Sequence, residues 1–308
     1  MMRPQRSRVV LVTRKTPLEL LIERYGALGQ AAFDIRSRGQ DMGRQEEMHE
    51  LFQAGLNDVI EAIPPDRHRA RVDRDALDRF LFAPDDLVVM IGQDGLVPNT
   101  AKYLQGQLAI GINPDPTHYD GILCPHPPSA AGELFAWAET RHTPGYRVER
   151  RVMAEAQRED GQKLLALNEV FIGHRSHQSA RYRICLGKRE ERQSSSGVIV
   201  STGTGSTGWA RSISLQRELD ATPPGVEERR LACFVREPWP SVATGTELTF
   251  ESIGPKEQLV IVSEMGEGGV VFADGIESDR IEFLDGQTLE VQIASQALNL
   301  VMPEGDAS

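Results

Sequence analysis

The chain of 308 residues has little cysteine and no long apolar segment. Its three cysteines, Cys124, Cys185 and Cys233, lie far apart, which excludes a zinc-binding spacing and a disulfide framework, so we expect buried free thiols. No apolar run approaches the roughly 20 residues that span a bilayer. The run of residues 9–12 is too short for the core of a signal peptide. We therefore expect a cytoplasmic protein without a membrane segment.

Basic residues are fewer than acidic ones: the chain has 34 lysines and arginines and 45 aspartates and glutamates, which gives a net charge of -11. A chain with this balance is not attracted as a whole to nucleic acid or to anionic membranes, so we expect neither as a partner. The composition, 40% hydrophobic and 26% charged, is typical of soluble globular proteins. The length suffices for two modest domains or one large domain.

Strands and helices alternate over roughly the first 125 residues. The expected elements are a strand over 8–13, helices over 17–35 and 42–63, a strand over 68–73, a short helix over 74–82, and strands over 87–91 and 108–112. Thr16 and Pro17 suit the cap and the first position of a helix. Leu77, Phe80 and Leu81 are expected to face inward. This alternation predicts a parallel sheet of Rossmann-like type.

Beyond a helix expected over residues 129–141, the pattern changes to short strands joined by Gly, Pro and Asp turns. The expected strands are 146–155, 163–172, 181–186, 198–201, 230–235, 248–252, 258–263, 270–272, 280–284 and 289–293. Such a series favours a β-sandwich. The predicted fold class is therefore α/β plus β. An N-terminal α/β domain takes residues 1–141 and a mostly antiparallel β-sandwich takes residues 142–308, with a return of the chain end to the first domain left open.

A glycine-bounded turn follows the buried strand at residues 87–91. The turn reads Gly92-Gln93-Asp94-Gly95, and its glycines allow unusual backbone angles and leave room for a ligand. In open α/β sheets ligands bind at the carboxyl ends of strands, where free backbone N–H groups suit phosphate. The alternative is an ordinary tight turn with a solvated aspartate, since short glycine motifs are weak signals.

A second unusual segment consists of residues 201–208, which are all Ser, Thr or Gly and follow an apolar strand. Small hydroxyl residues and glycines let backbone amides and side-chain oxygens approach phosphate or ribose. Trp209, expected to open a helix, can stack on a base. A flexible linker is disfavoured by the adjoining strand. His174 and His177 have no evident third partner, so we predict no metal ligands in the chain.

These motifs together resemble those of the NAD kinase family. That family carries a Gly-Gly-Asp-Gly turn after a parallel strand, an Asn-Glu pair, and a Thr-x-Thr-Gly-Ser-Thr-Ala-Tyr loop. This chain has the turn at 92–95, the pair Asn168-Glu169 and the loop at 202–209, in the same order and at similar spacing. Asp274-Gly275 matches a later turn of the family, and residues 195–197 look more like the mitochondrial branch. The resemblance covers nearly the whole chain.

The resemblance implies an activity and a set of site residues. The activity is phosphoryl transfer from ATP, with Mg²⁺, to the 2′-hydroxyl of the adenosine ribose of NAD, giving NADP. Asp94 would act as the general base or orient that hydroxyl, and Asn168 and Glu169 would hold ribose and adenine-side groups. The implied nucleotide-binding residues are Gly92, Gly95, Asn168, Glu169, Thr204, Gly205, Ser206, Thr207, Gly208, Trp209 and Ser212. The partners implied are small-molecule nucleotides and further copies of the chain, as a dimer or tetramer.

The chain departs from the family pattern at Gln93, Leu96 and the pair Gly208-Trp209. If Gln93 occupied a backbone angle open only to glycine, the strain would cost on the order of 1–3 kcal/mol. Its side chain could also fill space meant for phosphate. Two alternatives therefore stay open, a kinase of another hydroxyl compound such as a lipid or sugar, and a nucleotide-binding regulatory protein without catalysis. The phosphoryl donor, ATP or polyphosphate, is likewise open.

Overall fold

The computed structural model describes residues 8–39, 42–141, 144–218 and 222–304. The chain forms two compact units, unit 1 with Met1–Val148 and Asn299–Ser308, and unit 2 with Glu149–Leu298. The domain boundary expected after residue 141 adjoins residues 142–143, which lie outside the described part. The unit limits fall within two strands, β5 (Tyr146–Arg158) and β16 (Thr288–Pro303), so each of these strands contributes residues to both units.

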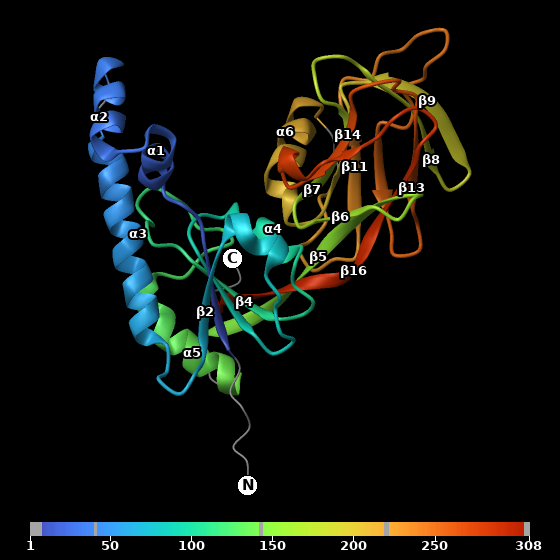
Figure 1. The fold of residues 1–308 in the computed structure, drawn as a ribbon. Helices are drawn as coiled ribbons and strands as arrows, with labels where there is room; N and C mark the ends of the chain where they lie inside the picture. Colours follow the sequence, from blue (N-terminus) through green and yellow to red (C-terminus); the bar gives the residue numbers. More distant parts are fainter. Residues whose placement is uncertain (1–7, 40–41, 142–143, 219–221, 305–308) are drawn as a thin grey trace. The chain divides into compact units, whose positions relative to one another are not determined.

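Unit 1 contains a parallel sheet with the order β2-β1-β3-β4-β16 (Figure 1). The strands are β1 (Val9–Thr13), β2 (Arg69–Asp73), β3 (Leu87–Ile91), β4 (Leu108–Ile112) and the end of β16. All four neighbouring pairs run parallel. Every residue of β1, β3 and β4 is buried, as expected for inner parallel strands. The predicted Rossmann-like sheet is thus confirmed, and the carboxyl ends of β1, β3 and β4 share one edge.

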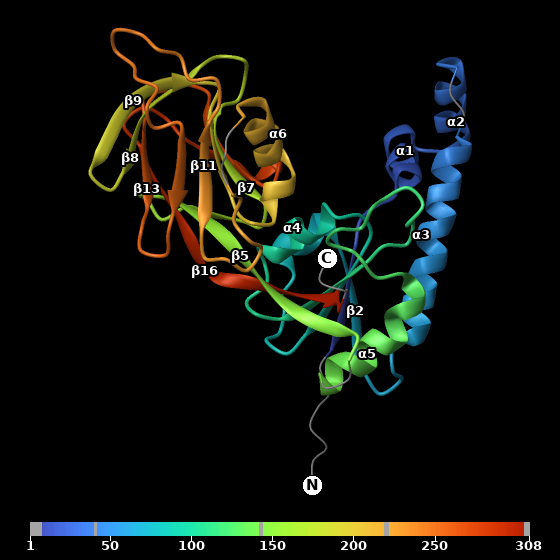
Figure 2. The same cartoon turned by 180° about the vertical axis from the view of Figure 1, so that it is seen from behind.

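Five helices accompany this sheet in the described part of unit 1: α1 (Pro17–Tyr25), α2 (Leu28–Ser37), α3 (Gly43–Ala62), α4 (Leu96–Ala101) and α5 (Ala131–Thr140). Two short 3-10 turns, η1 (Arg74–Arg79) and η2 (Pro128–Ala130), complete it. Helices α3 and α5 lie side by side on one face of the sheet (Figure 2). Their Phe52, Leu56, Leu134 and Phe135 join the strand residues in one core. None of the helices described here is long and apolar enough to cross a membrane.

Two local expectations in unit 1 were wrong. The first helix begins as predicted, with Thr16 and Glu19 forming a capping box, but it does not run on to residue 35. It ends at Gly26, whose left-handed φ of 78° lets its N–H reach the Ile22 carbonyl, and a separate helix follows. The short helix at 74–82 ends at Arg79, so Leu81 lies outside it and is 88% exposed instead of facing inward.

Unit 2 consists of two β layers, which confirms the predicted sandwich. One layer is antiparallel, in the order β12-β11-β10-β7-β14-β15. The other contains the antiparallel series β16-β13-β8-β9, and β6 pairs with β5. The bounds are β6 (Lys163–Ala166), β7 (Glu169–His174), β8 (Ala180–Leu186), β9 (Arg189–Ser195), β10 (Val198–Ser201), β11 (Leu231–Val235), β12 (Phe250–Ile253), β13 (Leu259–Ser263), β14 (Gly269–Ala273) and β15 (Ile281–Glu282).

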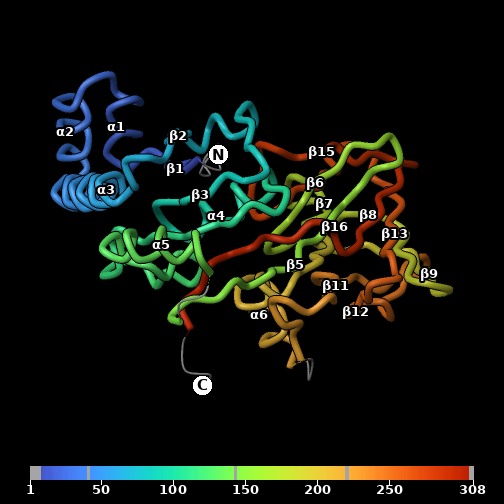
Figure 3. The backbone as a smooth tube through the Cα atoms, turned by 90° about the horizontal axis from the view of Figure 1, so that it is seen from below, coloured from blue at the N-terminus to red at the C-terminus, as the bar shows by residue number. Residues whose placement is uncertain are grey.

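Apolar side chains from both layers meet in the core of unit 2. Val170 and Val200 come from the first layer, and Ile184 and Ile261 come from the second. On the other side of the first layer, helix α6 (Trp209–Gln216) packs beside β11 and completes a smaller apolar cluster (Figure 3). Short 3-10 turns lie at η3 (Gly205–Thr207) and η4 (Glu277–Asp279). Helix α6 therefore starts directly after the Ser/Thr/Gly loop, as predicted.

The strand boundaries differ from expectation at three places in unit 2. The strand expected over 163–172 is two strands, β6 and β7, separated by residues 167–168. Strand β9 was missed because its sequence, REERQSS, is polar and it pairs only with β8 at the edge of its sheet. Strand β16 extends over 16 residues because it serves both units.

Glycine is required at one position of β4 by the close approach of another segment. A Cβ added to Gly111 would lie 2.2 Å from the Leu123 carbonyl oxygen and 2.8 Å from the Cys124 Cα. Contacts below 3.0 Å with backbone atoms force a shift of the chain. Gly132 in α5 is the opposite case, because a Cβ added there would have nothing within 4 Å.

We therefore predict that Gly111→Ala destabilises the protein by about 1–3 kcal/mol or more, as overpacking against backbone does. Gly132→Ala is the matched control, and we expect it to be neutral or stabilising by about 0.5–1 kcal/mol, because alanine favours a helix interior. Urea unfolding followed by circular dichroism measures both variants. Equal stability of the two variants would contradict this prediction, because it would show that the segment at residues 123–124 moves at little cost in free energy.

Candidate functional site

The turn after β3 holds its aspartate by three backbone hydrogen bonds. Gly92 takes a φ of 152°, which favours glycine, and the chain then passes through Asp94 into α4. The Asp94 carboxylate accepts N–H bonds from Ile122 at 2.9 Å, Leu123 at 2.9 Å and Cys124 at 3.1 Å. Asp94 is therefore not a solvated turn residue. Since an ionised carboxylate offers about four acceptor positions, roughly one position stays available.

The Asp94 carboxylate also affects the protonation of the neighbouring Cys124 thiol. Cys124 is fully buried, and burial together with the nearby Asp94 charge raises the pKa of its thiol, so the thiol stays protonated. Burial likewise raises the pKa of Cys233 to about 12. Both are free thiols, as expected, whereas Cys185 is free but only partly buried. Neither buried thiol has the thiolate character that a nucleophile needs.

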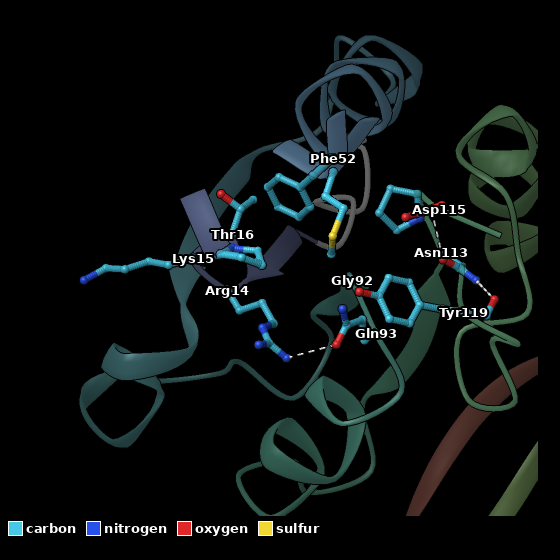
Figure 4. A pocket seen from close by; sticks show the side chains of 12 residues that line it. Arg14, Lys15, Thr16, Phe52, Gly92, Gln93, Asn113, Asp115 and Tyr119 are labelled. Carbon is cyan, nitrogen blue, oxygen red and sulfur yellow. Dashed lines mark hydrogen bonds between the residues drawn. The ribbon is translucent and has the colours of Figure 1, made fainter. Parts of the chain in front are cut away.

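A small cavity of about 50 Å³ lies next to the turn, at the carboxyl ends of β1, β3 and β4 (Figure 4). Gln93 lines it and is not among the residues with a positive φ, so the condition for backbone strain at this position is not met. The Gln93 side-chain oxygen accepts a hydrogen bond from Arg14 at 3.4 Å. Lys15 points away from the cavity and binds Glu23 at 2.7 Å. Arg14 is thus the cation that the cavity presents.

The opposite wall of this cavity is a hydrogen-bonded loop that follows β4. The Asn113 side chain donates to the Tyr119 carbonyl at 2.8 Å and accepts from the Asp115 N–H at 3.0 Å. Burial alone would raise the pKa of Asp115, but hydrogen bonds from His118 and Thr117 outweigh it and leave the pKa lowered. Sequence reasoning named no site residue here, although Asn and Asp alternating with Pro after a buried strand was an available signal.

The Asn-Glu pair and the Ser/Thr/Gly loop lie together within unit 2. The Thr202 N–H donates to the Asn168 carbonyl at 2.9 Å, and the Thr202 hydroxyl donates to the Leu167 carbonyl. Gly205 packs so closely that an added Cβ would lie 2.2 Å from the Asn168 carbonyl oxygen. Two motifs separated in sequence therefore form one structural group. Asp94, in unit 1, belongs to a separate group with Gly92 and Gly95.

Asp274 fixes the Asn168 segment, and sequence reasoning did not select it as a site residue. Its carboxylate accepts N–H bonds from Leu167 at 3.0 Å, Asn168 at 2.6 Å and Glu169 at 3.3 Å. Its φ of 53° lies in the left-handed region, which aspartate tolerates better than most residues. The available signal was the Asp-Gly pair after a buried strand, the same pattern as Asp94-Gly95.

Glu169 is partly buried in this group and has an unusual protonation equilibrium. Burial, and secondly the charge of Asp274, raise the pKa of Glu169 to about 7. The protonated form can donate a hydrogen bond, whereas the ionised form only accepts. Glu169 can therefore change its hydrogen-bonding role near neutral pH.

The remaining predicted residues divide into buried and accessible positions. Thr204 and Gly205 are buried, and the Thr204 hydroxyl lies 3.4 Å from a guanidinium nitrogen of Arg151, which pairs with Glu149 at 2.7 Å. Thr207, Gly208 and Ser212 are exposed, and Ser206 is partly buried and donates to the Gly203 carbonyl. Accessible hydroxyls and amides thus surround the start of α6.

Trp209 is partly buried and already has ring partners. The Phe171 ring stacks on it at 5.7 Å between centroids, and the Arg236 guanidinium lies 4.9 Å from its centroid. Trp209 therefore supports a cation as well as an aromatic neighbour. Within the described residues there is no group of three or more His, Cys, Asp or Glu side chains that could hold a metal ion.

Comparison with known proteins finds similar sequences among NAD kinases. The rat protein named NAD kinase 2, mitochondrial, is 27% identical over 256 residues, covering 67% of this chain and 60% of its own length. The NAD kinase of Methanoculleus marisnigri is 35% identical over 130 residues, covering 41% of this chain and 46% of its own length. The chain is thus similar in sequence to NAD kinases. No sequence profile of a protein family matches it.

Solved structures of NAD kinase relatives share the fold. Yeast NADH kinase, complexed with NADH, superimposes with a TM-score of 0.62 at 13% identity, covering 97% of this chain and 84% of the yeast chain. An NAD kinase from Archaeoglobus fulgidus, in complex with ATP, gives a TM-score of 0.57 at 18% identity, covering 96% of this chain and 94% of its own. The chain spans less than two thirds of the length of the rat relative.

We predict that Glu169 makes the stability of the protein depend on pH. Its folded-state pKa near 7 lies above the ordinary value of 4.5, so the unfolded chain loses the proton first as pH rises. The stability of the folded state falls between about pH 4.5 and pH 7 and then stays constant with respect to this group. Glu169→Gln, which mimics the protonated form, should match the parent near pH 4.5 and exceed it by on the order of 1–3 kcal/mol at pH 8.

Urea unfolding at pH 4.5, 6 and 8 measures this difference. Glu190→Gln, at an exposed site on β9, is the control and should show no such growth with pH. A difference between Glu169→Gln and the parent that is constant across this range would contradict the raised pKa.

Proposed function

We propose that this member of the NAD kinase family transfers the terminal phosphoryl group of ATP to the 2′-hydroxyl of the adenosine ribose of NAD, giving NADP. The names of the rat and archaeal relatives support NAD as acceptor. The ATP and NADH bound in the two related structures support a nucleotide donor and a dinucleotide acceptor. The observation that carries the proposal is the fixed Asp94 carboxylate at the carboxyl end of β3, next to a cavity lined by Arg14.

Phosphoryl transfer needs positioning and charge neutralisation more than covalent chemistry. Asp94 is held in one orientation by the Ile122, Leu123 and Cys124 amides and keeps about one acceptor position. That position suits a hydrogen bond from the attacking hydroxyl, whose proton Asp94 would accept. Arg14 would place positive charge beside the transferred group, and Gln93 would orient the guanidinium.

The group in unit 2 would bind the dinucleotide. Asn168 and Glu169 are held by Asp274 and by the loop, so their side chains are positioned before a ligand arrives. Thr207, Gly208 and Ser212 are exposed, and the hydroxyls of Thr207 and Ser212 suit phosphate or ribose oxygens. Gly92, Gly95, Thr204, Gly205, Ser206 and Trp209 complete the proposed nucleotide-binding set.

Magnesium would arrive as the ATP complex. Mg²⁺ is usually held by one or two carboxylates with substrate phosphates and water, and does not need a protein cage. The described residues offer no cluster of three ligating side chains, and this fits that mode. The phosphates of ATP and water would supply ligands to the ion, which would neutralise phosphate charge.

One alternative is favoured by a specific observation. The three amide bonds to Asp94 give this side chain a structural role by itself, so a nucleotide-binding protein without turnover would keep it too. In that case NAD or ATP stabilises the protein without reaction.

Homo-oligomerisation, as a dimer or tetramer, and a cytoplasmic location also stay predictions. Light scattering measures the oligomeric state, and localisation of a tagged chain measures the location.

We predict that NAD, ATP and Mg²⁺ together yield NADP and that Asp94→Asn lowers kcat by about 10²–10⁴-fold, the usual contribution of a general base. Reverse-phase chromatography of the products measures NADP. Thermal unfolding of the same variant separates lost chemistry from lost folding, because the amide of asparagine also disturbs the bonds to residues 122–124. Absence of NADP from the parent with ATP and with polyphosphate would sink the proposal and leave the non-catalytic alternative.

A second prediction concerns the cation of the unit 1 cavity. Arg14→Gln should raise the KM for ATP about tenfold, whereas Lys15→Gln should change it less than twofold, because Lys15 binds Glu23 and points away. Gln93→Gly, which restores the family glycine, should raise this KM by a few fold because Arg14 loses its partner. A lower KM in Gln93→Gly would mean that Gln93 obstructs the phosphate instead.

A further inference from the structure

A cavity of about 600 Å³ in unit 2 is not explained by the proposed reaction. It is lined by the loop after β7, the start of α6, Arg236 after β11, and residues of β14 and η4. Of the predicted nucleotide-binding residues, only Trp209 lines it. The volume lies within the usual range of roughly 300–1,000 Å³ for small-molecule sites.

The lining is basic although the whole chain is acidic. The lining contains three arginines, Arg175, Arg236 and Arg280, and one carboxylate residue, Glu277. The net charge of the whole chain is -11. His174 and His177 add further nitrogen donors. A concentration of guanidinium groups in a concave site attracts anions more strongly than the same charges spread over a surface.

These three arginines differ from others of unit 2 in their partners. Six arginines of unit 2 form close ion pairs with carboxylates, namely Arg151, Arg158, Arg183, Arg189, Arg192 and Arg230. Among the described residues, Arg175 and Arg280 form no ion pair, and Arg236 approaches only Glu237 at 3.6 Å. The guanidinium charges at this cavity are therefore largely uncompensated by protein.

Backbone and ring contacts hold the arginines in place. The Arg175 N–H donates to the Gly268 carbonyl at 2.8 Å, and the Arg236 N–H donates to the Gly197 carbonyl at 2.8 Å. The Arg280 guanidinium donates to the Glu277 carbonyl at 3.1 Å. Arg236 also lies over Trp209, which rests on the stacked Phe171 ring. The guanidinium groups of Arg236 and Arg280 therefore have contacts before any ligand binds, which reduces the entropy lost on binding.

We propose that this cavity binds a ligand with a chain of two or more phosphate groups. Guanidinium groups bind phosphate through paired N–H bonds, and three of them at one cavity suit several phosphate groups better than one. The phosphate chain is shared by free polyphosphates and by nucleotides, so both are candidate sources. The proposal does not depend on phosphoryl transfer at Asp94, because no residue of the unit 1 cavity takes part, and it shares only Trp209 with the proposed nucleotide-binding set.

The experiment titrates the full chain with inorganic tripolyphosphate and pyrophosphate, using sodium sulfate at equal ionic strength as the comparison. Isothermal titration calorimetry gives the affinity, and tryptophan fluorescence reports on Trp209 in a Trp239→Phe background that removes the exposed indole. We expect tripolyphosphate to bind more tightly than pyrophosphate, and sulfate to bind weakly. Trp209→Phe should abolish the fluorescence change.

The double variant Arg175→Gln with Arg280→Gln should lose at least tenfold in tripolyphosphate affinity. Arg183→Gln, an exposed arginine on β8 outside the cavity, is the matched control and should lose less than twofold. Thermal unfolding checks that the variants fold. The absence of tripolyphosphate binding, or equal losses in the double variant and the control, would overturn the proposal.

Two further arms separate the sources and the two sites. A nucleotide ligand requires that ATP compete with tripolyphosphate and bind more tightly, whereas a free polyphosphate requires the reverse. Asp94→Asn and Arg14→Gln should leave the Trp209 fluorescence change on tripolyphosphate binding unchanged. Loss of that change in Arg14→Gln would place the bound anion in unit 1 and overturn the assignment, whatever the outcome for NADP formation.

Discussion

Two aspartate side chains, Asp94 and Asp274, each hold one of the two candidate groups together. Each of them binds three successive backbone amides. Asp94 binds the amides of residues 122–124, and Asp274 binds those of residues 167–169. A hydrogen bond to a charged acceptor contributes on the order of 1.5–3 kcal/mol, and an unpaired buried amide would cost a similar amount. Each carboxylate therefore helps to determine the path of a short segment, residues 122–124 in one case and the connection from β6 into β7 in the other.

The segment fixed by Asp274 in turn supports the Ser/Thr/Gly loop. Thr202 donates to the carbonyls of Leu167 and Asn168, while Asp274 takes the amides of the same stretch. Both sides of this backbone are thus occupied, and the side chains of Asn168 and Glu169 stay available. The break between β6 and β7 falls at residues 167–168, two of the three residues whose amides bind Asp274.

Local sequence patterns predicted the structure correctly where a single strand or helix is concerned. The run Leu87–Ile91 could only be a buried strand, and Thr16 with Pro17 marked a helix start correctly. Contacts distant in sequence were beyond such reasoning. The amide partners of Asp94 lie about 30 residues away and those of Asp274 more than 100, so the sequence indicated the turns but not what they hold. The same holds for Arg236, whose position over Trp209 depends on the packing of α6 and β11.

The route of the chain has a consequence for the order in which the protein is completed. Unit 2 is an insertion within unit 1, because residues 299–301 of β16 pair with β4 and the Val301 carbonyl binds His126. During synthesis, the parallel sheet lacks this last strand until residues 299–301 have been made. The β-sandwich can assemble from residues 149–298 before then, since domains generally fold as units. The sheet that carries Asp94 is therefore begun before the β-sandwich and completed after it. Until then the edge of β4 has no neighbouring strand.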